Sequence, residues 1–234
     1  MTEELSFEAY LSISQKKFGI YLLDKKNLKN IFKEEVYLEN DSSLIDYYLL
    51  NNFLEKNIFK IEKLIGNFLR GIVVIIENDQ TLNLSVGIKK KNYGEKINKN
   101  YLERSLAELK HLFKENYQNN KIIHFIVKRY LIDGVNYTKF DKEIDGEDMC
   151  VEVNFISISN TLIKEISNVL KKYQINIDHL FEKEYIKTIF EDEHLDLSII
   201  AFKIQNGYNR NEVTLVPKSL KKIGFFEKFF QLFS

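Results

Sequence analysis

The sequence predicts an α/β protein in which strands and helices alternate along 234 residues. Three observations support this class. Segments 7–14, 16–23 and 30–38 alternate apolar and polar residues with the period of two that strands have. Segment 100–113 places apolar residues three and four positions apart, which is the spacing of a helix face. Ile72–Ile76 is a short apolar run of the kind that forms a buried strand.

Caps and turns define the other elements of the first half. Asp41 is expected to cap a helix that continues to Ile61, because its carboxylate can accept hydrogen bonds from the first free backbone N–H groups. A turn at residues 78–80 is predicted to join strand 72–76 to the alternating strand 82–88. These two strands would then form a hairpin.

Residues 121–181 form the most regular part of the chain. A long strand over 122–132 ends at the turn Asp133-Gly134, and a second turn, Asp145-Gly146, leads into strand 149–159. A helix over 160–173 and a short strand at 175–177 complete a compact α+β unit. Farther on, a last hairpin is predicted, with strands at 195–204 and 212–216.

Composition excludes several classes of protein. Lys plus Arg and Asp plus Glu both number 34, so no basic excess favours nucleic acid as a partner. Cys150 is the only cysteine, which rules out an intrachain disulfide and a cysteine-rich zinc site. The acidic start is unlike a signal peptide, and no apolar run approaches the roughly 18–20 residues of a spanning helix. A cytoplasmic protein is therefore expected.

Residues 121–181 also resemble a known family. "KIIHFIVKRYLIDG" is similar to the strand and Ile-Asp-Gly turn of the FtsA family, the actin-like bacterial cell-division proteins. "DKEIDGEDMCVEVNFISIS" resembles the glycine turn and alternating strand that follow in that family, and "IKEISNVLKKYQINIDHLF" resembles its next helix and strand. The resemblance implies a shortened, divergent member with a partial actin-like (ribonuclease-H-like) lobe, an inserted α+β subdomain and a C-terminal amphipathic helix.

The resemblance also implies how the chain is divided. It assigns residues 1–97 and 182–216 to the lobe, residues 98–181 to the inserted subdomain and residues 217–234 to the terminal helix. The turns of the inserted subdomain are the expected partner-binding positions, namely Asp133, Gly134, Asp145 and Gly146. Most of a second lobe, including the region that holds FtsZ in the family, would have no counterpart in this chain.

Nucleotide binding is not expected. Actin-like ATPases hold phosphates with two hairpins that each need a carboxylate and glycines. By the resemblance these hairpins correspond to Ser12, Ser14 and Lys16 and to Lys203 and Gly207, where the acidic residue and most of the glycines are absent. No P-loop or nucleophile motif is present either. We therefore expect no ATP, no other cofactor, no metal and no enzymatic activity.

The C-terminal segment has the composition of a membrane-binding helix. Its apolar and aromatic residues fall on one half of a helical wheel and its lysines on much of the other half, which suits an anionic membrane surface. A helix docked on protein is the alternative. The residues expected to bind lipid are Lys218, Lys221, Lys222, Ile223, Phe225, Phe226, Lys228, Phe229, Phe230, Leu232 and Phe233.

The resulting functional prediction is an FtsA-like tether or adaptor at the division site, on the cytoplasmic face of the inner membrane. Expected partners are FtsZ, the cytoplasmic tails of late division proteins, the membrane surface and further copies of the chain. Two alternatives remain open. One is a PilM-like scaffold of pilus or secretion machinery, which shares the lobe and the insertion. The other is a remnant actin-like ATPase.

Overall fold

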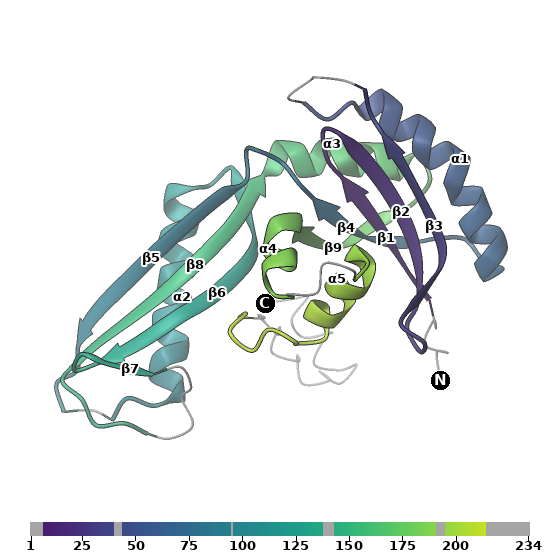
Figure 1. The fold of residues 1–234 in the computed structure, drawn as a ribbon. Helices are drawn as coiled ribbons and strands as arrows, with labels where there is room; N and C mark the ends of the chain where they lie inside the picture. The colour runs from purple at the N-terminus through teal and green to yellow at the C-terminus, as the bar shows by residue number, and fades with distance from the viewer. Residues whose placement is uncertain (1–6, 40–43, 95, 138–142, 191–194, 214–234) are drawn as a thin grey trace, which may run out of the picture.

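The computed structural model describes residues 7–39, 44–94, 96–137, 143–190 and 195–213, which form two sheets flanked by helices (Figure 1). The larger sheet has the strand order β3-β2-β1-β4-β9. β1, β2 and β3 form an antiparallel meander, while β4 and β9 run parallel to β1. The strands are β1 (Phe7–Ile13), β2 (Lys17–Asp24), β3 (Lys29–Tyr37), β4 (Gly71–Ile76) and β9 (Asn176–Glu182).

The smaller sheet is inserted in the chain between β4 and β9. Its four strands are antiparallel, in the order β5-β8-β6-β7. The helix α2 (Lys99–Asn116) covers one face, where Leu102, Leu109 and Phe113 are buried against the sheet. The strands are β5 (Leu82–Lys91), β6 (Asn120–Ile132), β7 (Val135–Tyr137) and β8 (Asp148–Ser159).

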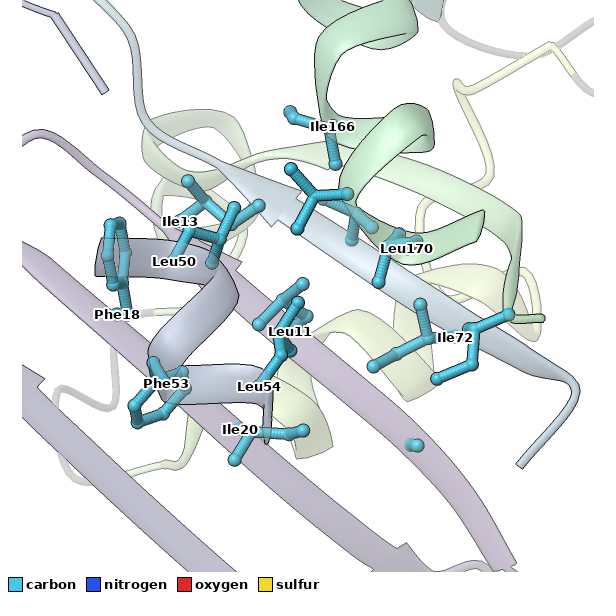
Figure 2. Close-up of a cluster of buried hydrophobic side chains, with 14 of the residues drawn as sticks. Leu11, Ile13, Phe18, Ile20, Leu50, Phe53, Leu54, Ile72, Ile166 and Leu170 are labelled. Carbon is cyan, nitrogen blue, oxygen red and sulfur yellow. The ribbon is translucent and has the colours of Figure 1, made fainter. Parts of the chain in front are cut away.

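One face of the larger sheet packs against α1 (Tyr47–Ile65) and α3 (Asn160–Lys171). Figure 2 shows this core, in which Leu50 and Leu54 of α1 meet Leu11 of β1 and Ile72 of β4 faces α3. Full burial of such a side chain contributes about 1.5–3 kcal/mol. The apolar stripe of α1 therefore holds the helix on the sheet.

The opposite face of the larger sheet is covered by α4 (Lys183–Thr188) and α5 (Leu197–Gln205). Tyr10, Tyr21 and Val73 are buried beneath these helices. Because both faces are covered, β4 is apolar at every position from Ile72 to Ile76, as expected of a central parallel strand.

An antiparallel meander followed by two parallel strands, in this order, is the arrangement of a ribonuclease-H-like lobe. The structure thus confirms an α/β fold made of an actin-like lobe with an inserted α+β subdomain. Sheet membership does not follow the boundaries predicted at residues 97 and 181. β5 belongs to the inserted sheet, whereas α3 packs on the lobe and β9 completes its sheet.

Both predicted hairpins are wrong. β4 and β5 follow each other in sequence but lie in different sheets, because β4 is buried on both sides and β5 alternates. Segment 195–204 was expected to be a strand, yet α5 occupies residues 197–205. Its buried residues Ala201 and Ile204 are three positions apart, which fits a helix. The apolar residues 199–202 are consecutive, so the helical spacing is not visible in the sequence.

Two further predictions concern element ends. The first helix begins at Tyr47 and is capped by Asp46, whose carboxylate accepts the Leu49 N–H at 2.9 Å, rather than by Asp41. The short strand predicted at 175–177 is the longer β9. Asp41 and the tail 217–234, with all its predicted lipid-binding residues, lie outside the described residues. Of the helices that are described, none is both long and apolar enough to cross a membrane.

Candidate functional site

The β1–β2 turn lies where an actin-like ATPase would have its first phosphate hairpin. Ser14 closes the turn, because its Oγ accepts the Lys17 N–H at 3.0 Å and its own N–H donates to the Lys17 carbonyl at 2.9 Å. Ser12 and Ser14 are buried and Lys16 is exposed. No glycine opens this turn, and the N–H groups of Ser14 and Lys17 are already bonded. These two N–H groups are therefore not free to bind a phosphate.

The residues expected in the second phosphate hairpin lie on α5 and just after it. Lys203 is in the last turn of the helix, with its ammonium 5.2 Å from the centre of the Phe190 ring. Gly207 has φ +82°, and its N–H donates to the Ile204 carbonyl. The positive φ that glycine allows therefore ends the helix. Lys203 and Gly207 thus belong to the end of a helix and not to a hairpin.

The two Asp-Gly turns of the inserted subdomain meet at its tip. Asp133 of the first turn bonds to the residues after the second turn, because its carboxylate accepts the N–H groups of Glu147 and Asp148 at 3.0 and 2.8 Å. A Cβ on Gly146 would come within 2.3 Å of Ile132 Cγ2. The carboxylate of Asp133 and the absent side chain of Gly146 thus hold the tip together. Among the described residues, no cluster of His, Cys, Asp and Glu is placed to hold a metal ion.

A buried polar network joins the two sheets. His124 of β6 has a fully buried side chain, and its Nδ1 lies 2.7 Å from Glu212 Oε1. Its Nε2 accepts the backbone N–H of Glu182 at 3.0 Å, at the end of β9. Because Nε2 accepts, the ring proton resides on Nδ1, which donates to the Glu212 carboxylate. His124 is therefore a neutral bridge between the inserted sheet and the lobe.

Tyr185 and Asn209 complete this network, which we call the junction (His124, Glu182, Tyr185, Asn209 and Glu212). The Tyr185 hydroxyl donates to Glu212 Oε2 at 2.8 Å and accepts from Asn209 Nδ2 at 2.7 Å. Burial raises the pKa of Tyr185, and the Glu212 charge raises it further. Both nitrogens of His124 are occupied by protein groups. The pair of His124 and Glu212 is thus arranged for holding structure and not for proton transfer to a substrate.

A groove runs along the surface beside the junction. Two hollows of about 390 and 370 Å³ share Lys121, Ile122 and Ile123 of β6. The first is also lined by Lys110 and Lys114 of α2, and the second by residues of α3 and β9. We call these two hollows the junction groove. It lies between the lobe and the inserted subdomain.

Apolar and charged side chains line the junction groove. Ile122, Ile123 and Phe125 are apolar, Lys110, Lys114 and Lys121 are basic, and Glu212 and Asp178 are acidic. Burial and the neighbouring charge of Lys114 lower the pKa of Lys110. Within the described part of the chain, Lys110, Lys114 and Lys121 have no carboxylate within salt-bridge distance. Unpaired cations beside apolar side chains suit an extended segment that carries both apolar and acidic residues.

Comparison with known proteins found similarity to solved structures. No protein-family model and no curated protein matches the sequence. A chain of the PilM-PilN type IV pilus biogenesis complex has a similar fold, at 9% identity and a TM-score of 0.49, over 76% of this chain and 48% of that one. The assignment of the ribonuclease-H-like lobe rests on the strand order of the larger sheet.

Two more solved structures are similar. One is the cytoplasmic domain of EpsL, an inner membrane component of the type II secretion system of Vibrio cholerae, at 14% identity and a TM-score of 0.41, over 81% of this chain and 61% of that one. The other is a protein of Bacteroides thetaiotaomicron with an actin-like ATPase fold, at 17% identity and a TM-score of 0.34, over 80% and 56%. The chain spans less than two thirds of each of the three, and at these identities the likeness concerns the fold alone.

Proposed function

We propose that the chain is a non-catalytic actin-fold scaffold that holds an extended segment of a partner protein in the junction groove. The observation that carries the proposal is the set of three lysines that line the groove beside Ile122, Ile123 and Phe125. Among the described residues, these lysines have no carboxylate within salt-bridge distance. The closed β1–β2 turn supports the non-catalytic part, because bound N–H groups cannot also hold phosphate. The expected occupant is an acidic and apolar segment of a membrane component.

We place the scaffold in pilus or secretion machinery of the PilM type, at the cytoplasmic face of the inner membrane. A division role of the FtsA type is the second candidate. That resemblance implies a second phosphate hairpin at Lys203 and Gly207, and these residues lie in and just after the helix α5 instead. The resemblance over residues 121–181 fits both candidates, since PilM-like scaffolds share the inserted subdomain.

Photocrosslinking in cells tests the scaffold proposal. A photoreactive residue at Ser167, which lines the groove, is expected to capture a cytoplasmic segment of an inner-membrane assembly protein. The double variant Lys114→Glu, Lys121→Glu is expected to abolish the adduct, since it reverses the charge of two of the lysines that line the groove. Lys128→Glu, an exposed position on the same strand, is the matched control and should leave the adduct unchanged. An adduct that survives the double variant would contradict the role of the groove.

Thermal unfolding with and without magnesium ATP tests the non-catalytic part. A ligand that binds only the folded state at 100 times its Kd stabilises that state by about 2.7 kcal/mol, which raises Tm by several degrees. We expect no shift. A reproducible rise would support the remnant ATPase instead.

The second candidate has its own observation, the aromatic and basic composition of residues 217–234. Cosedimentation with vesicles of phosphatidylglycerol and phosphatidylethanolamine compares the full chain with a chain that ends at Val216. If only the full chain pellets, the tail binds membrane, and a subsequent pull-down of FtsZ would favour the division role. If neither pellets, the division tether loses its distinguishing feature.

A further inference from the structure

The outer edge of β5 lacks the features that usually protect an edge strand. β5 pairs with β8 on one side only and forms one margin of the inserted sheet (Figure 1). From Leu82 to Ile88 it has no charged residue and no proline, and its ten pairs with β8 contain no register shift. Edge strands of soluble proteins are ordinarily interrupted by charges, prolines or bulges, because an open flat edge adds further strands.

The edge strand β3 of the larger sheet differs from β5 because it has these protective features. β3 carries Lys29, Lys33, Glu34 and Glu35, and its pairing with β2 contains a register shift near Leu22. Charge and irregularity therefore protect that margin. By contrast, β5 is uncharged over seven residues and its pairing is regular, which marks this edge as a surface for strand addition.

The side chains of β5 remain incompletely covered. Leu82, Leu84, Val86 and Ile88 point toward the core under α2 but are only half-buried, while Asn83, Ser85 and Gly87 are exposed on the other face. The Phe113 ring of α2 lies 4.9 Å from that of Phe155 on β8, so the helix sits under the middle of the sheet. Among the described strands, none pairs with the outer side of β5, and the apolar side chains of β5 can bury more area.

The pattern of β5 is symmetric about Ser85. In an antiparallel pairing of two copies centred there, Leu84 faces Val86 and Leu82 faces Ile88, while Asn83 faces Gly87. Apolar residues then meet apolar residues on one face, and small residues meet on the other. The Lys89–Lys91 end of one strand would approach the 78–81 turn of the other, where Asp79 is exposed. The apolar pattern is therefore self-complementary in this register.

We propose that β5 is a self-association edge, through which two copies of this chain pair antiparallel about a two-fold axis at Ser85. The inserted sheets of the two copies then form one continuous eight-stranded sheet. A two-fold interface requires that one surface complement itself, and the symmetric pattern of β5 satisfies that requirement. A foreign strand would not need this symmetry.

Cysteine crosslinking of the full chain tests the register. Cys150 is first replaced by serine, since it is the native thiol. Ser85→Cys is expected to form a covalent dimer on mild oxidation, because opposite residues of paired strands have Cβ atoms about 4.5–5.5 Å apart. Asn83→Cys is the matched control on the same exposed face. It lies about 13 Å from its own copy in this register and should remain monomeric.

A mixture completes this test. Asn83→Cys and Gly87→Cys variants are each expected to stay monomeric alone and to form a covalent heterodimer when combined, because these positions face each other. Equal dimer yields from Ser85→Cys and Asn83→Cys, or no dimer from Ser85→Cys, would overturn the proposal.

Charge variants at the axis give an independent test by sedimentation. The unmodified chain should sediment with twice its mass of 27.8 kDa as concentration rises. Ser85→Lys and Ser85→Asp should each be monomeric, since each places like charges opposite each other. An equimolar mixture of the two should restore the dimer. A monomer at every concentration, or a dimer that both single variants retain, rules out pairing through β5.

Discussion

Replacing His124 by phenylalanine separates the packing of the junction from its hydrogen bonds. A phenyl ring can keep the contacts that the imidazole makes with Phe181 and Tyr185, whose ring centres lie 5.6 and 4.1 Å away. It cannot bond to Glu212 or to the Glu182 N–H. The bond to the carboxylate contributes about 1.5–3 kcal/mol, and an unsatisfied buried N–H costs about 1–3 kcal/mol. We therefore expect a loss of about 3–5 kcal/mol.

Urea unfolding measures this loss. The expected shift in midpoint is about 1–2 M, with little change in the slope. His111→Phe is the control, because the His111 side chain is 72% exposed on α2. Its change should stay within about 0.5 kcal/mol, as for other surface substitutions. If His124→Phe were as stable as the parent chain, the junction would not hold the two sheets together, and the reasoning would fail.

Three further predictions concern other parts of the fold. Gly146→Ala should destabilise the tip by about 1–3 kcal/mol in urea unfolding, because its Cβ would press against Ile132. Asp133→Ala should cost about 1–2 kcal/mol by the same measurement, whereas the exposed Asp145→Ala should change little. Burial raises the pKa of Tyr10, Tyr21 and Tyr185 above the ordinary value of 10.0, so their contribution to stability is complete below that pH and is lost as pH rises above it. Their ionisation, followed by ultraviolet absorbance, should therefore coincide with loss of circular dichroism above pH 10.0. Ionisation of all tyrosines while the chain is still folded would contradict this prediction.

Local pattern predicted several of the strands and helices. β2, β6 and β8 alternate or end at Asp-Gly turns, and α2 carries its apolar residues at helical spacing, so each could be located. Elements surrounded by apolar neighbours were harder to predict from the sequence. α5 lies in a largely apolar run. Its helical period is visible only in the folded chain, where the lobe buries some of these side chains and not others.

Long-range partners could not be predicted from the sequence. The membership of β5 in the second sheet depends on pairing with β8, about seventy residues away, and no nearby residue signals it. The junction was missed for the same reason. His124 lies in a strand that could be predicted, but its partners Glu182, Tyr185 and Glu212 come from separate segments that meet only in the folded chain.

The place of the insertion has a consequence for how the chain folds. β4 pairs with β9 in parallel, although roughly a hundred residues separate them in sequence. Closing so long a loop is entropically costly, and pairings of high sequence separation form slowly. If the inserted sheet and α2 assemble first, the two ends of the loop are brought near each other, and the remaining closure is short. Folding rate should then respond more to substitutions in the inserted sheet, such as Val153→Ala, than to equally destabilising ones in β9.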